Sequence, residues 1–177
     1  MVACSERTPG RAVPDRGMDG TEGSGGPGTP STSTDSSPKG DNPLISLDPC
    51  TLPTPSMKTT LGLTKTPQTL TLPSSKSCSW QVGDGEISNR FNFSIAIFPK
   101  TGIDDVVADG EKKPVTVGSR RAIQSLRAAS GVCAISIEVT ATSRVDMQAT
   151  GAGSNDGSLI CPKALAAAEL IEPELPK

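Results

Sequence analysis

The chain has 177 residues, a formal net charge of −2, 34% hydrophobic and 2% aromatic residues, five Cys, and neither His nor Tyr. Without His, His-based catalytic triads, imidazole-ligated zinc sites and imidazole proton shuttles are excluded. The balanced charge argues against a basic nucleic-acid-binding face, so we expect no nucleic acid partner. The chain also lacks the run of about 18 apolar residues that a transmembrane helix requires.

The first four residues, Met1-Val2-Ala3-Cys4, match the end of a bacterial lipobox. A complete signal peptide would need a charged and then an apolar region before them. Bacterial GTG, TTG and CTG start codons are written as Met but encode Val or Leu internally. We therefore expect the true start to lie upstream and Cys4 to be the diacylglyceryl-modified N-terminus. A diacyl group supplies the two chains that stable membrane anchoring needs.

Residues 5–46 are predicted to form a disordered linker. Between residues 19 and 43, 19 of the 25 residues are Gly, Pro, Ser or Thr. Such a segment buries too little apolar surface to offset an ordering cost of about 1–2 kcal/mol per residue. We expect the globular domain to occupy residues 47–177 and to survive removal of everything before Leu47.

Two helices are predicted in this domain. A short helix lies between Thr54 and Gly62, where Thr can cap the first turn and Gly suits a left-handed end. The alanine-rich segment Cys161–Ile171 predicts a closing helix with Pro162 in its first turn. The residues expected to face the rest of the domain are Ala164, Leu165, Ala168 and Ile171.

Alternating apolar residues predict strands at Phe91–Phe98, Cys133–Val139 and Val145–Ala149. Ala129–Gly131 is predicted to be a hairpin turn after an earlier strand near Ala122–Leu126, although that segment also has helical spacing. One apolar and one polar face indicate an antiparallel sheet wetted on one side. We therefore expect an α+β fold with a single antiparallel sheet of about five strands, and both helices on its apolar face.

The remaining four cysteines lie in the predicted domain and permit three pairings. Cys50–Cys78 and Cys133–Cys161 join neighbours in the sequence at equal separation, and we favour this pairing. Four buried free thiols are the alternative. A four-thiolate metal site lacks a C-x-x-C pair, so no metal or other cofactor is expected. Disulfides would place the domain in an oxidising compartment outside the cytoplasm.

Several short motifs follow one another in an order that resembles a known family. They are Asp48-Pro49-Cys50, Cys78-Ser79-Trp80, Gly118-Ser119-Arg120-Arg121, Gly131-Val132-Cys133 and Cys161 before the alanine-rich segment. The region from residue 47 to residue 177 is similar to actinobacterial lipoproteins grouped as domain of unknown function 3558. The resemblance implies a signal-dependent lipid anchor on the outer face of the cell membrane, but no catalytic residues.

Candidate ligand-binding residues are few. Trp80 could form a ligand platform, and Arg120 and Arg121 could bind an anionic group. No catalytic residue and no metal ligand is predicted. We expect a membrane-anchored extracytoplasmic lipoprotein with a non-catalytic domain that binds an envelope protein or a small ligand. The alternatives are an envelope enzyme that uses carboxylates, of the wall-glycan hydrolase type, and a structural spacer domain.

Overall fold

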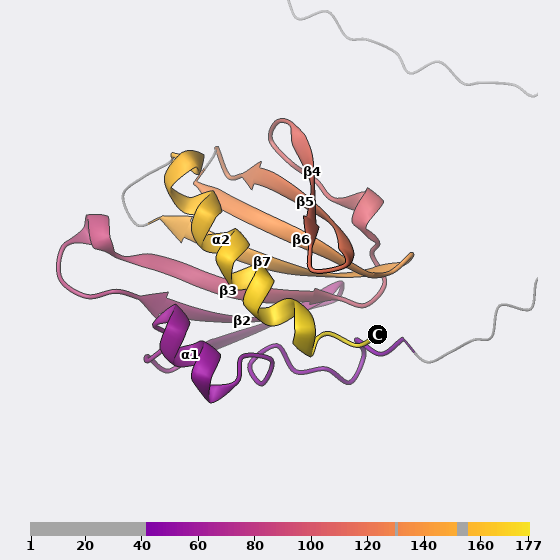
Figure 1. Ribbon diagram of the computed structural model, residues 1–177, viewed down its shortest axis with the longest axis horizontal. Coiled ribbons are helices and arrows are strands. Elements are labelled where there is room, and N and C mark those ends of the chain that lie inside the picture. The colour runs from indigo at the N-terminus through magenta and orange to yellow at the C-terminus, as the bar shows by residue number, and fades with distance from the viewer. Residues whose placement is uncertain (1–41, 130, 152–155) are drawn as a thin grey trace, which may run out of the picture. The chain divides into compact units, whose positions relative to one another are not determined.

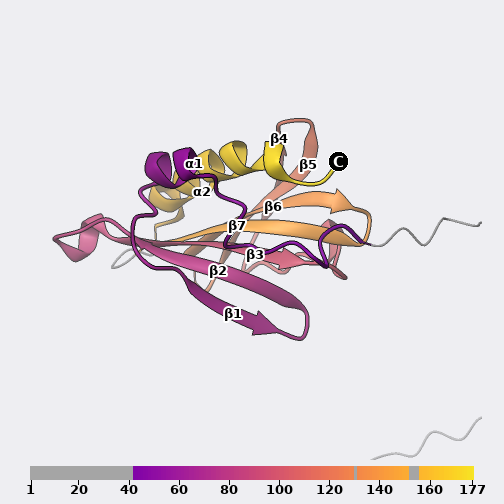
Figure 2. The same ribbon diagram turned by 90° about the horizontal axis from the view of Figure 1, so that it is seen from below.

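The computed structural model describes residues 42–129, 131–151 and 156–177, which form one antiparallel sheet with helices on one face (Figures 1 and 2). The strands are β1 (Gln68–Leu72), β2 (Ser75–Val82), β3 (Phe91–Phe98), β4 (Lys112–Val117), β5 (Arg120–Arg127), β6 (Val132–Thr140) and β7 (Ser143–Gly151). Their order across the sheet is β1-β2-β3-β7-β6-β5-β4. The helices are α1 (Pro55–Leu61) and α2 (Gly157–Ile171), with 3-10 turns at Ile87–Asn89, Ile103–Asp105 and Glu172–Glu174.

The α+β class and the single antiparallel sheet are confirmed, but the sheet has seven strands and not about five. Two of the additional strands, β1 and β4, are its edges. Every residue of β1 and most of β4 is exposed. The alternation of Thr with Leu in 69–72 and of Val with Thr in 115–117 covers only a few residues, which is a weak strand signal. The segment Ala122–Leu126, whose apolar spacing also fits a helix, lies in strand β5 and pairs with β6.

The core lies between the sheet and α2. Alternate residues of the central strands, among them Ile95, Ile135 and Met147, are fully buried on this face. Helix α2 contacts β6 and β7 and contributes Ala164, Ala168 and Ile171 to the core, as predicted, whereas Leu165 is only partly buried. The small alanines let the helix approach the sheet closely, which suits a core with few aromatic side chains.

The short helix forms as expected, but the closing helix begins earlier than predicted. Thr54 Oγ1 accepts a hydrogen bond from the Met57 N–H (3.3 Å), and Gly62 has a left-handed backbone. Helix α2 begins at Gly157, not Cys161, because the Asp156 carboxylate accepts from the Ser158 N–H (2.8 Å) and caps the helix there. Pro162 therefore lies inside the helix and not at its start.

The prediction that the linker extends to residue 46 is wrong for residues 42–46. Leu44 is fully buried in the core, and its N–H donates to the Asn42 side chain (2.9 Å). The Asn42 amide also donates to the Pro99 carbonyl, and the Lys76 ammonium donates to the Ile45 carbonyl (3.0 Å). One apolar side chain in a Pro-rich context gives no periodic signal, which is why this attachment was missed. The rest of the predicted linker, residues 5–41, lies outside the described residues.

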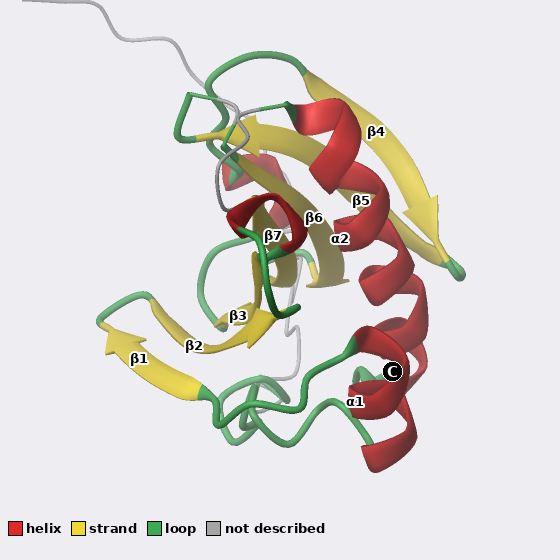
Figure 3. Ribbon diagram, turned by 90° about the vertical axis from the view of Figure 1, so that its left-hand side faces the viewer, coloured by secondary structure: helices red, strands yellow, loops and turns green. Residues whose placement is uncertain are grey.

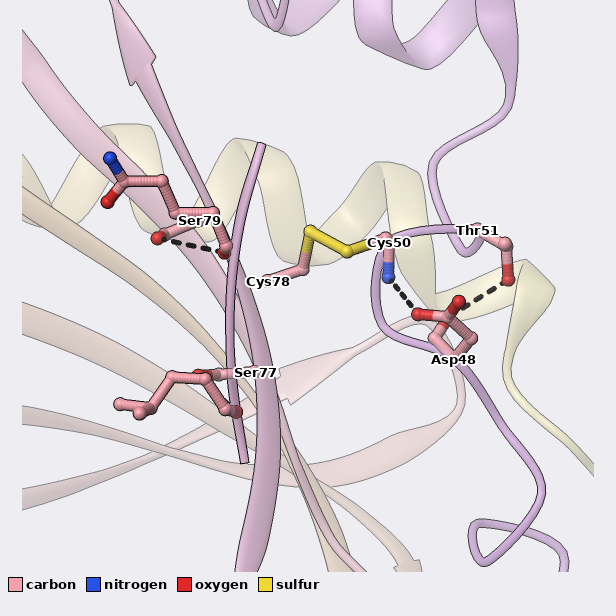
Figure 4. The surroundings of a disulfide bond; sticks show 8 residues. Asp48, Cys50, Thr51, Ser77, Cys78 and Ser79 are labelled. Carbon is pink, nitrogen blue, oxygen red and sulfur yellow. Dashed lines mark hydrogen bonds between the residues drawn. A yellow bond between two sulfur atoms is a disulfide. The ribbon is translucent and has the colours of Figure 1, made fainter. Parts of the chain in front are cut away.

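Two disulfides, Cys50–Cys78 and Cys133–Cys161, join the cysteines that the sequence analysis paired. The first ties the segment before α1 to strand β2, and Figure 4 shows its surroundings. The Asp48 carboxylate accepts from the Cys50 N–H (2.8 Å), so the Asp-Pro-Cys motif forms a tight turn that presents the cysteine. The second bridge fixes α2 on strand β6.

The connection from β3 to β4 crosses the face of the sheet that carries no helix. Its residues, 99–111, pass over β7, β6 and β5, and the side chains of Ile103 and Val106 within it are buried. The Arg144 guanidinium of β7 donates to the carbonyls of Thr101 (3.2 Å) and Gly102 (2.8 Å). This connection, hereafter the crossover, therefore covers half of the helix-free face.

A buried ion network lies under the crossover. Asp146 is fully buried, with Oδ1 3.0 Å from Arg144 Nε and Oδ2 3.0 Å from Arg127 Nη2. The second contact is an ion pair without the angle of a hydrogen bond. Arg144 also lies over the Phe98 ring, 4.1 Å from its centroid. Two cations therefore share one carboxylate in a site with little water.

Replacement of Asp146 by Asn should destabilise the protein by about 3–5 kcal/mol, because the buried Arg144 guanidinium and the partly buried Arg127 guanidinium lose their counter-ion. Chemical denaturation followed by circular dichroism measures this change. Asp84→Asn is the matched control, since that side chain is 88% exposed and pairs with Lys65 at the surface. Equal denaturation midpoints for the Asp146→Asn and Asp84→Asn variants would contradict the assigned role of Asp146.

Candidate functional site

The half of the helix-free face that the crossover leaves open carries a polar pocket. The pocket lies over β1, β2 and β3 and has a volume of about 410 Å³. Its lining combines hydroxyl, amide and ammonium groups from Lys65, Thr66, Gln68, Ser79, Gln81 and Asn92 with part of Trp80. This volume is in the range of small-molecule sites, about 300–1,000 Å³.

Strand alternation places these side chains. Trp80 and Phe93 pair across β2 and β3 and stack in the core, with ring centroids 6.1 Å apart. Because successive residues of a strand point to opposite faces, Ser79, Gln81 and Asn92 point to the helix-free side. Figure 4 shows this for β2, where Ser77 and Ser79 project away from the disulfide of Cys78.

The only charged side chain in the pocket lining is already paired. Lys65 Nζ lies 2.9 Å from Asp84 Oδ1 and donates to the Gly83 carbonyl (3.3 Å). The hydrogen bond from Lys65 lowers the pKa of the Asp84 carboxyl. The lining residues include no carboxylate and no thiol. The pocket is therefore suited to hydrogen bonding with a neutral polar molecule.

Trp80, predicted as a possible ligand platform, is 2% exposed and packs in the core. The pocket residues themselves were missed by sequence reasoning. The available signal was the polar half of the alternation in Phe91–Phe98 and, in Ser75–Val82, an alternation that was not recognised as a strand.

Arg120, the first of the two predicted anion-binding arginines, holds the C-terminal end of the chain. Its Nε lies 3.0 Å from Glu172 Oε1, and its Nη2 donates to the Pro176 carbonyl (2.6 Å). Gly118 has a positive φ of 58°, and a Cβ there would collide with the Glu172 carboxylate. The Gly-Ser-Arg segment therefore fastens the end of α2 to the sheet.

Arg121, the second, is half exposed and bridges two carboxylates. It donates to Asp104 Oδ1 (3.0 Å) on the crossover and to Glu138 Oε2 (3.0 Å) on β6. Hydrogen bonds from Arg121 lower the pKa of both carboxyls. Both carboxylates are thus ionised partners of one guanidinium. This group lies over β5 and β6, whereas the pocket lies over β1, β2 and β3.

The described residues hold neither a metal-ligating cluster nor a membrane-spanning helix. Within it, no group of three or more His, Cys, Asp or Glu side chains could hold a metal ion. Across the same residues, no helix has the length and apolar character to span a membrane. Cys4 lies outside the described ranges.

Replacement of Arg121 by Gln should raise the pKa of Asp104 and Glu138 toward their ordinary values of 3.8 and 4.5. A lowered folded-state pKa stabilises the protein above the unfolded-state pKa, and this contribution disappears as the pH falls through the folded-state value. The wild-type protein should therefore lose more stability than the variant on acidification below about pH 4.5. Carboxyl-carbon NMR titration measures the pKa values, and Asp156, whose pKa is lowered by Ser158, should not change.

Comparison with known proteins gives one family. A family model described as "Protein of unknown function (DUF3558)" matches residues 1–174. No curated protein and no solved structure matches the chain. Because the match covers nearly the whole sequence, the chain belongs to the domain-of-unknown-function 3558 family.

Proposed function

We propose that the protein is a membrane-anchored extracytoplasmic lipoprotein whose folded domain binds a ligand without catalysis. Anchoring is supported by the lipobox-like Met1–Cys4 segment, followed by a Gly-, Pro-, Ser- and Thr-rich stretch. The two disulfides support an oxidising compartment. The family match spans both the N-terminal segment and the domain, in agreement with a single functional unit.

The polar pocket on the helix-free face carries the binding proposal. Its groups are side-chain amides, hydroxyls and a lysine whose charge is balanced by Asp84. Uncharged donors and acceptors match the hydroxyl groups of a sugar better than they match a phosphate or a carboxylate, which are bound by charge-assisted hydrogen bonds. The ligand class that fits best is therefore a neutral, hydroxyl-rich molecule such as one sugar unit of an envelope glycan.

The alternative of an enzyme using carboxylates receives less support from the geometry. A general acid needs a carboxyl with a raised pKa. Among the described residues, the four carboxyls whose pKa departs from its ordinary value, Asp84, Asp104, Glu138 and Asp156, are all shifted downward. They therefore favour the ionised form, which suits structural ion pairs and helix capping.

Replacement of Gln81 or Asn92 by Ala should weaken binding of a neutral oligosaccharide about two- to tenfold, because each change removes one or more net hydrogen bonds. NMR titration of the full chain with a panel of neutral and anionic sugars measures both affinity and location. Gln148→Ala is the matched control, since this residue lies on β7 outside the pocket lining. An equal loss in the control, or no shift of pocket resonances with any neutral sugar, would refute the assignment.

Replacement of Cys4 by Ser should abolish membrane anchoring, because the thioether to the diacylglyceryl group cannot form. The experiment expresses the gene with its native upstream DNA and follows metabolic labelling with palmitate and detergent-phase partitioning. Wild-type protein should be labelled and partition with detergent. An in-frame stop directly before codon 1, or labelling that persists in the variant, would contradict the proposal.

A further inference from the structure

The two edges of the sheet differ in a way that points to an interaction surface. Edge strand β1 carries no charge, every residue is exposed, and Leu70 and Leu72 are 56% and 50% exposed. No element of the described chain lies along its outer side in Figures 2 and 3. Edge strand β4 instead contains Lys112, Lys113 and Pro114. Lysine and proline are the usual means of preventing edge-to-edge pairing, so one edge is protected and the other is not.

The outward backbone groups of β1 belong to its threonines. Ser77 Oγ donates to the Leu70 carbonyl and Ser79 Oγ to the Gln68 carbonyl, both at 3.3 Å, and these residues are cross-strand partners. The carbonyls of Gln68 and Leu70 therefore point toward β2. Because the direction alternates along a strand, the N–H and C=O groups of Thr69 and Thr71 point outward.

We infer that β1 pairs with β1 of a second copy of this chain, antiparallel and centred on Leu70. The segment Pro67-Gln-Thr-Leu70-Thr-Leu-Pro73 is nearly palindromic about this leucine. In this register Thr69 of each copy lies opposite Thr71 of the other, and each such pair exchanges two N–H···O bonds. All four outward backbone groups of each strand are then satisfied.

The flanking prolines fix the length and register of the pairing. Pro67 and Pro73 occupy the next outward positions on either side and have no N–H to leave unpaired. A shift by two residues would place a threonine of the strand opposite a proline and lose a hydrogen bond in each half. In the centred register, Leu70 of one chain also lies opposite Leu70 of the other in a closely spaced pair. This contact covers the exposed leucine side chain of each chain.

The protected β4 edge closes the assembly at two copies. A β1–β4 contact would be head-to-tail and could propagate into a filament, whereas a β1–β1 contact is self-complementary and stops. The two-fold axis stands perpendicular to the sheet, so the helices of both copies lie on one side. The two polar pockets, each lined by Gln68 of β1, then lie near each other on the opposite side. The inferred dimer rests on the properties of the β1 edge alone and does not depend on binding of a sugar ligand.

Cysteine cross-linking tests both the contact and its register. Leu70→Cys, in a Cys4→Ser background of the full chain, should form a disulfide-linked dimer on mild oxidation, because closely spaced pairs bring Cα atoms to about 4.5 Å. Leu72→Cys is the matched control on the same strand with similar exposure. In that variant the two introduced thiols would be about 13 Å apart along the strands and should not cross-link.

Oligomeric state supplies an independent measurement. Analytical ultracentrifugation of the Cys4→Ser chain should show a monomer–dimer equilibrium. Leu70→Lys should raise the protein concentration at the midpoint of this equilibrium at least about tenfold, because like charges then lie opposite each other. Thr116→Lys on β4 should leave the midpoint unchanged. A monomer at all concentrations, equal cross-linking of the Leu70→Cys and Leu72→Cys variants, or an unaltered midpoint in Leu70→Lys would overturn the proposal.

Discussion

The crossover from β3 to β4 is the constraint on which the rest of the structure depends. These two strands follow each other in the chain but are separated by β7, β6 and β5 in the sheet, so residues 99–111 must run across one face. Helix α2 occupies the other face, because the apolar alternation of the central strands requires a cover there. The crossover divides the helix-free face into a covered half and an open half, and the open half carries the polar pocket.

The main role of the buried ion network is to hold the crossover in position on the sheet, and its net contribution to stability is smaller. A buried ion pair is weak support for stability, since desolvation offsets much of the Coulomb attraction. Its geometry, however, is specific: Arg144 must face Asp146 in order to reach the carbonyls of Thr101 and Gly102. An apolar residue at position 144 could fill space but could not hold two loop carbonyls. The network therefore fixes where the crossover lies, and hence where the open half begins.

Sequence reasoning succeeded where a pattern was periodic or local. The caps of α1 follow from residues near one another, and the apolar face of β3 follows from a repeat of two. The cysteine pairing follows from the order and equal separation of the cysteines. It failed where the signal was tertiary. Leu44 is buried although it stands among Pro and Ser, the exposed strand β1 has only a short alternation of Thr and Leu, and the pocket joins side chains from three strands. Arg120 looked like a free cation because its partners, Glu172 and the last carbonyls, lie far along the chain.

Strand β2 connects the core, the pocket and the edge strand β1, because its two faces make different contacts. On the helix side, Cys78 is bridged to Cys50 and Trp80 packs against Phe93. On the other side, Ser77 and Ser79 donate to carbonyls of β1. Ser79 and Gln81 also line the pocket. Strand β1 itself has no buried side chain, and β2 is the one described strand with which it pairs. The disulfide therefore supports the pocket and the free edge from the opposite face of the sheet, which explains how a strand with no buried side chain is held in place.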